Sequence, residues 1–318
     1  LDHLTHGFTM RTLKLYRHGV TMGTPPAKND HLRAKRGQVH GWSQSAARRN
    51  TQFLRSVDER HLPTTDAGDP LRAVALTLTL KHCPPTPDHW HTLRTAYMKR
   101  LRRLGLYRSH WVTEWQRRGV PHLHGAFWLP EGVYPQMLIN HWCDLAHNYG
   151  ALPRGQHVTP IVDAVGWFKY LSKHASRGAS HYQRHPENIP PEWQLKTGRV
   201  WGHTGPWPTR DAIEFEIDDH AFFRLRRLYR RWRVADSRRE IPEKIRLYLR
   251  KNPEMNIAPF GVKARESGAF RRVTQSKKML KNSERKLSSV IGISEWIPED
   301  VQMLALDWLR SEGHEIEC

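Results

Sequence analysis

One potential β-hairpin places the strongest constraint on the fold. Residues 110–115 and 120–129 are two runs rich in apolar, strand-forming residues, and a short loop separates them. The loop ends in Arg-Arg-Gly119, and glycine readily adopts the positive φ that a three-residue hairpin loop requires. An antiparallel hairpin closed by this loop places Glu114 opposite His122.

Three potential metal ligands share one face of this predicted hairpin. Alternate side chains of a strand point to the same face, so His122 and His124 project together, and the predicted register adds Glu114. Two imidazoles and a carboxylate that converge from adjacent strands can hold a divalent cation and leave coordination positions open. The alternative reading is that the histidine pair is structural.

A second segment that carries reactive side chains is residues 163–175, which the pattern predicts as a helix capped by Asp163. Helical spacing places Tyr170, Lys173 and His174 on one face, while the apolar residues lie mostly elsewhere. Such a helix can pack with its apolar side and present the polar side to a site.

The charge of the chain indicates its partner. The 318 residues include 51 Lys and Arg against 31 Asp and Glu, for a formal charge of +20 and an isoelectric point near 10.3. Nucleic acid and anionic membranes are the usual partners of such a surplus. No apolar run of about eighteen residues could span a bilayer, and three cysteines without metal spacing fit a reducing cytoplasm. We therefore expect a cytoplasmic protein that binds nucleic acid and no membrane.

Changes in composition predict three regions: a basic N-terminal arm over residues 1–40, a central domain over 41–220, and a C-terminal extension over 221–318. Residues 221–290 hold 21 Lys and Arg against 6 Asp and Glu, which is typical of a helical phosphate-binding appendage or of charged helices exposed to solvent. The extension ends in an acidic stretch with an amphipathic helix over residues 298–310, whose predicted apolar face includes Leu304.

The remaining elements of the central region alternate between strand and helix patterns. Helices are predicted over residues 43–57, 89–104 and 134–147, and strands over 73–80, 158–160 and 213–217.

Three short motifs resemble those of a known superfamily. Leu-Thr-Leu-Thr at 76–79, Pro-His-Leu-His at 121–124 and Tyr-Leu-Ser-Lys at 170–173 occur in the order found in rolling-circle replication initiators of the HUH endonuclease superfamily, as encoded by bacterial plasmids and filamentous phages. Glu114 matches the acidic third metal ligand of some branches. Gly166 stands where two-tyrosine members have their second tyrosine, so the chain resembles a single-tyrosine enzyme.

The resemblance implies an α+β fold in which a central antiparallel β-sheet is flanked by helices, the HUH or RRM-like palm. Composition, and not the resemblance, predicts the basic, mainly helical C-terminal extension that follows it. The resemblance also implies Mg²⁺ or Mn²⁺ on His122, His124 and Glu114. Tyr170 would attack single-stranded origin DNA, leaving a 5′-phosphotyrosine and a free 3′-hydroxyl, and Lys173 would assist.

Arginines and a histidine near these motifs are the expected DNA contacts: Arg117, Arg118, His174 and Arg177. The chain has no P-loop, so origin unwinding would need a host helicase, and a host polymerase would extend the 3′-hydroxyl. Two alternatives remain at this point, a non-catalytic basic DNA-binding protein and an HUH transposase or relaxase.

Overall fold

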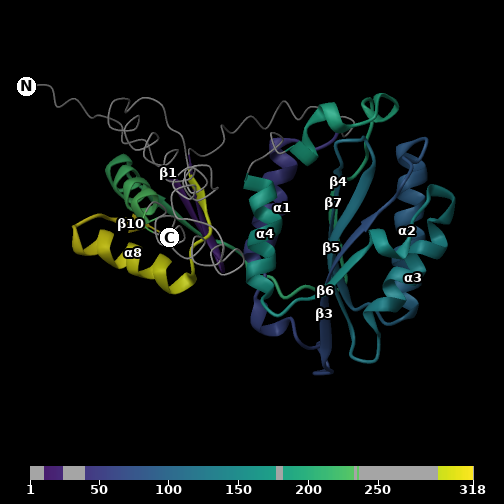
Figure 1. The fold of residues 1–318 in the computed structure, drawn as a ribbon. Coiled ribbons are helices and arrows are strands. Elements are labelled where there is room, and N and C mark those ends of the chain that lie inside the picture. The colour runs from purple at the N-terminus through teal and green to yellow at the C-terminus, as the bar shows by residue number, and fades with distance from the viewer. Residues whose placement is uncertain (1–10, 24–39, 177–181, 233–234, 236–292, 318) are drawn as a thin grey trace, which may run out of the picture. The chain divides into compact units, whose positions relative to one another are not determined.

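The computed structural model describes residues 11–23, 40–176, 182–232, 235 and 293–317. For residues 172–176, 182 and 293 it describes the backbone only. The chain divides into two compact units (Figure 1). The larger unit contains residues 16–18 and 29–211, and the smaller unit contains residues 1–15, 19–28 and 212–318.

The larger unit is built on an antiparallel sheet with the strand order β6-β3-β5-β4-β7. Its strands are β3 (Leu71–Thr79), β4 (Arg108–Trp115), β5 (Pro121–Pro130), β6 (His157–Pro160) and β7 (Trp201–Thr204). The central strand β5 is buried along nearly its whole length, because both of its edges are paired and both of its faces are covered.

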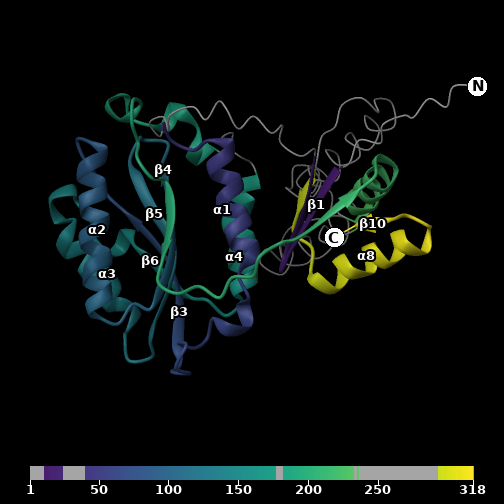
Figure 2. The same ribbon diagram turned by 180° about the vertical axis from the view of Figure 1, so that it is seen from behind.

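Helices cover the two faces of this sheet in pairs. Helices α1 (Gln44–Ser56) and α4 (Ala164–Ser176) lie on one face, and α2 (Pro87–Arg103) and α3 (Pro135–Leu145) lie on the other (Figures 1 and 2). One hydrogen bond from each pair of helices to β4 shows which face of the sheet that pair covers. His110 pairs with Asn50 of α1 at 2.7 Å, and the Trp90 indole of α2 donates to Thr113 at 3.2 Å. The predicted α+β fold with a central antiparallel sheet flanked by helices is confirmed.

The hairpin has the register that the sequence predicts. Gly119 has a φ of 77°, and the Gln116 amide donates to the Val120 carbonyl at 2.9 Å. Glu114 consequently lies opposite His122. Ser43 caps α1 as expected, because its hydroxyl accepts a hydrogen bond from the Ala46 amide.

Strand β7 is not among the strands that the sequence predicts. It extends the sheet beyond β4, with Gly202 opposite Trp111. A Cβ at Gly202 would lie 2.8 Å from the Trp111 ring, so glycine is what permits the two strands to pack here.

The smaller unit has a second antiparallel sheet, with the order β10-β8-β1-β2-β9. Its elements are β1 (Arg11–Tyr16), β2 (Gly19–Gly23), β8 (Ile213–Ile217), β9 (Ile293–Glu295), a helix over residues 219–232, α8 (Glu299–Ser311) and β10 (Ile316–Glu317). Buried side chains of the sheet and of both helices form one core, which includes Leu13, Phe215, Leu225 and Leu306.

Part of the segment predicted as an N-terminal arm, residues 1–40, belongs to this unit. Residues 11–23 form β1 and β2, which pair with β8 and β9 from the other end of the chain. The predicted helix near residue 300 is present, but Leu304 is 65% exposed, and the face that packs is Ala305, Leu306 and Leu309. Most of the basic part of the extension, residues 236–292, lies outside the described residues. Within the described part of the chain, no helix has the length and apolarity needed to cross a membrane.

Candidate functional site

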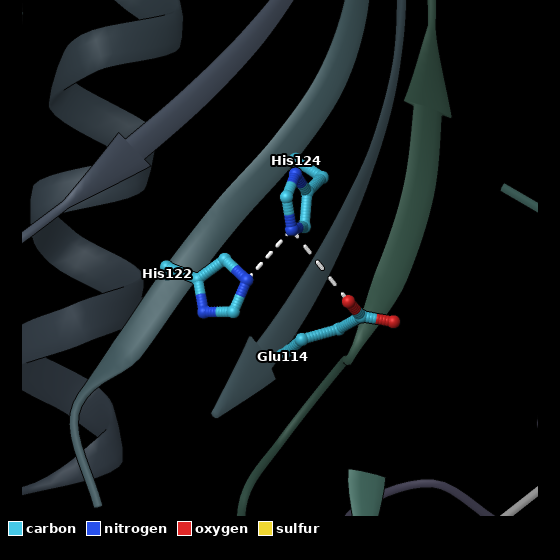
Figure 3. Close-up of side chains that lie close together, drawn as sticks. All are labelled: Glu114, His122 and His124. Carbon is cyan, nitrogen blue, oxygen red and sulfur yellow. Dashed lines mark hydrogen bonds and ion pairs between the residues drawn. The ribbon is translucent and has the colours of Figure 1, made fainter. Parts of the chain in front are cut away.

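Glu114, His122 and His124 converge on the central hairpin (Figure 3). Their ligand atoms all lie within 4.8 Å of one another. The Nε2 atoms of the two histidines are 2.7 Å apart, and the Nε2 atom of His124 lies 3.7 Å from a carboxylate oxygen of Glu114. This follows from the register, because Glu114 of β4 is directly opposite His122 of β5 and His124 is two residues further on.

The three side chains are almost completely buried, with Glu114 at 0%, His122 at 2% and His124 at 7% exposure. Burial lowers the pKa of His124, although the charge of Glu114 acts in the opposite direction. A neutral imidazole is the form that binds a metal ion. Two imidazole nitrogens and one carboxylate oxygen can hold a divalent cation and leave coordination positions open.

Thr77 of β3 contacts His124, the residue opposite it on the neighbouring strand β5. Thr77 pairs with His124 in the β3–β5 register, and its hydroxyl oxygen lies 2.9 Å from His124 Nδ1. A partner on Nδ1 leaves Nε2 directed toward the other two side chains. The Leu-Thr-Leu-Thr motif at 76–79 thus supplies a residue that orients His124.

A short turn beside the hairpin, η5 (Tyr182–Arg184), adds two contacts that the sequence did not predict. Arg184 is completely buried and donates from Nε to Glu114 Oε1 at 2.6 Å. Burial lowers the pKa of its guanidinium, and the charge of Glu114 partly offsets this. Gln183 Nε2 lies 3.2 Å from His122 Nε2. No motif or spacing relates this turn to the hairpin, so the sequence held no signal for it.

Tyr170 lies on α4, which covers the same face of the sheet as α1 (Figure 1). The triad is on that face too, because Glu114 alternates along β4 with His110, which contacts Asn50 of α1. Its side chain is 42% exposed, and its ring stacks on Trp167 with 5.2 Å between centroids. Phe168 and Leu171 of the same helix are buried. The backbones of Lys173 and His174 belong to α4.

The side chains of Lys173 and His174 lie outside the described residues, as does Arg177 entirely. Arg117 is exposed in the hairpin loop. Arg118, which the sequence predicts as a DNA contact, also makes contacts within the protein. Its guanidinium donates hydrogen bonds to the backbone carbonyls of Leu80 and Lys81. Part of its hydrogen-bonding capacity therefore fixes the loop.

The fold and the site define an α+β protein with a potential metal centre on its central hairpin. The family model for the replication-associated protein ORF2 matches residues 73–178, a segment that contains all three motifs. The chain is 46% identical to the replication-associated protein of Pseudomonas phage Pf3, over 96% of this chain and 99% of that protein. Two putative replication proteins of Xylella fastidiosa, from strains 9a5c and Temecula1, are 42% and 43% identical, over 96% and 90% of this chain and 99% of each relative.

The chain therefore belongs to the ORF2 family of replication-associated proteins. The predicted membership among replication initiators is confirmed. No solved structure is significantly similar to the chain.

Proposed function

We propose that this protein initiates rolling-circle replication by nicking single-stranded origin DNA. Tyr170 is the nucleophile, and His122, His124 and Glu114 hold a divalent cation, Mg²⁺ or Mn²⁺. The observation that carries the proposal is the buried triad, which a specific hairpin register assembles in a chain of the replication-associated family.

The chemistry is a transfer of one phosphodiester. The Tyr170 oxygen gives up its proton and forms a bond to phosphorus, the bond from phosphorus to the 3′ oxygen breaks, and that oxygen takes up a proton to become the free 3′-hydroxyl. A cation held by His122, His124 and Glu114 would supply Lewis-acid activation of the phosphate and would neutralise developing charge. The 5′-phosphotyrosine keeps the energy of the broken bond, so the reverse step rejoins strands without ATP.

Tyr170 needs assistance, because a phenol has a pKa of about 10. Lys173 follows one helical turn later, and its ammonium group would stabilise the phenolate or hold the phosphate. Tyr170 itself is 42% exposed, while Phe168 and Leu171 of the same helix are buried. The DNA contacts proposed from the sequence remain Arg117, Arg118, His174 and Arg177.

The test is covalent capture. The full chain is incubated with Mn²⁺ and a single-stranded library containing the origin region, and the complex is denatured in SDS. The wild type should give a protein–DNA adduct, and Tyr170→Phe should give none while it still binds DNA. Tyr134→Phe is a matched control, because Tyr134 is also an exposed tyrosine of the larger unit. An adduct that persists in Tyr170→Phe would show that another residue is the nucleophile.

The same assay separates the alternatives. A non-catalytic DNA-binding protein gives no adduct under any condition, whereas a transposase or relaxase gives one but prefers other DNA sequences. Because the sequence contains no P-loop, we also propose that a host helicase unwinds the origin and a host polymerase extends the 3′-hydroxyl.

A further inference from the structure

The turn η5 is held against the triad through Arg184. Its guanidinium lies 3.8 Å from the centroid of the Trp42 ring and donates to Glu114. Trp42 is itself fixed, because its indole donates to the backbone carbonyl of Thr113 at 2.8 Å. Arg184 is therefore held between two groups anchored on β4, and a completely buried arginine with such partners leaves the turn little freedom.

This anchoring places the neighbouring side chain, Gln183, beside the potential metal position. The amide nitrogen of Gln183 lies 3.2 Å from His122 Nε2, the atom that also faces His124. Adjacent ligand atoms of an octahedral cation with bonds near 2.1 Å lie about 3 Å apart. The Gln183 amide therefore lies at the spacing of a neighbouring ligand.

The hydrogen bond between Gln183 and His122 and a cation bound to His122 would compete for the same lone pair, the one on His122 Nε2. The amide N–H donates to the Nε2 lone pair of His122, and a cation on His122 would occupy that lone pair. A half-turn about the terminal torsion of Gln183 exchanges the amide nitrogen for the carbonyl oxygen at nearly the same place. Amide oxygens are ordinary ligands of hard divalent cations.

We propose that Gln183 is a fourth protein ligand of the cation, delivered by a turn that Arg184 anchors. The site would then offer two nitrogen and two oxygen donors and leave positions open on an octahedral ion for the DNA phosphate. The proposal rests on the metal centre described under the proposed function.

Mn²⁺ binding to the full chain without DNA tests this role, followed by the loss of the electron paramagnetic resonance signal of free Mn²⁺. Gln183→Leu keeps the side-chain bulk but removes both polar atoms, and it should weaken binding by at least about tenfold, because losing even a side chain that only hydrogen-bonds to a metal ligand costs about ten- to a hundredfold. Gln183→Glu keeps an oxygen donor and should bind at least as tightly as the wild type. Gln136→Leu, on the exposed side of α3, should change nothing.

Two results would overturn the proposal. One is Mn²⁺ affinity of Gln183→Leu within about twofold of the wild type, and the other is equal affinity of the Leu and Glu variants. His124→Ala separates this proposal from the metal centre itself. If His124→Ala loses Mn²⁺ and Gln183→Leu keeps it, only the fourth ligand is wrong. If the wild type and His124→Ala bind alike, the metal centre is wrong.

Discussion

At the scale of single residues, Thr77 shows how a side chain outside the triad can set its geometry. Its hydroxyl engages Nδ1 of His124, so that Nε2 faces Glu114. Thr77→Val keeps the β-branched shape and removes this contact. Mn²⁺ affinity should fall by about ten- to a hundredfold, because outer partners of metal-binding histidines have effects of this size.

The same titration measures the loss, and Thr159→Val on the exposed edge strand β6 is the matched control. Thermal unfolding should change little, since a single hydrogen bond contributes only about 1 kcal/mol. Wild-type affinity in Thr77→Val would remove the hydroxyl from the site.

His110 makes the stability of the larger unit sensitive to acid. Burial, followed by the charges of His203 and Arg184, lowers the pKa of His110 to about 3 in the folded chain. An unfolded histidine has a pKa near 6.5. Above that pH both states are neutral at this residue, so His110 contributes no pH dependence. As the pH falls below about 6.5, only the unfolded state binds the proton, and stability decreases by up to about 1.4 kcal/mol per pH unit.

Urea unfolding at pH 7 and pH 5 measures this contribution. The wild type should lose more stability between the two values than His110→Gln, in which the titrating group is absent. An equal loss in both proteins would assign the acid sensitivity to other residues.

Residues of the site differ in how far sequence alone could place them. Glu114 and His122 are joined by one local turn, so strand alternation and loop length predict their pairing. Arg184 is 70 residues away from Glu114, and no periodic pattern relates them. Gln183 is a common polar residue whose position depends entirely on that distant ion pair. Contacts between segments that are far apart in the sequence determine this part of the site. Local sequence patterns do not reveal such contacts.

At the scale of elements, two glycines shape the sheet for different reasons. Gly119 has a positive φ, but a Cβ there would meet nothing closer than 3.8 Å. Gly202 has room only for a hydrogen, because a Cβ would lie 2.8 Å from Trp111. Gly119→Ala should therefore cost about 1–2 kcal/mol through the backbone alone, whereas Gly202→Ala should cost stability through steric overlap.

Asparagine distinguishes the two causes, because it tolerates a positive φ but is larger than alanine. Gly119→Asn should be more stable than Gly119→Ala, and Gly202→Asn should be less stable than Gly202→Ala, as measured by urea unfolding. The same order of stability at both positions would contradict this explanation.

Elements with local signals were predicted well. Ser43 caps α1 as the sequence predicts, and apolar residues at helical spacing indicate both α1 and α2, although the sequence does not predict the Thr86 cap that starts α2 two residues earlier than expected. Most strands of the smaller unit were missed, because they are short and their partners are remote. Lys14 of β1, for instance, faces Glu214 of β8 across 200 residues of chain. A six-residue alternation near the N-terminus does not reveal a partner so far away.

At the scale of the whole molecule, one strongly basic segment lies outside the unit that carries the triad. The family match and the triad lie in the larger unit, whereas residues 236–290 contain 15 Lys and Arg against 6 Asp and Glu. Neutralised phosphates release counterions, so each phosphate contact steepens the dependence of DNA affinity on salt. We expect this basic segment to supply much of the nonspecific affinity and little of the nicking specificity.

Glutamine in place of Lys277, Lys278, Lys281, Arg285 and Lys286 tests that expectation. The slope of log affinity against log salt should become shallower by about 0.7 for each single-strand phosphate that these side chains no longer neutralise. Because the triad and Tyr170 are untouched, the adduct should still form at low salt on the same DNA sequence, which also confirms that the variant is folded. An unchanged slope would mean that these five cations contact no phosphate, and the larger unit would then have to supply the electrostatic part of DNA binding.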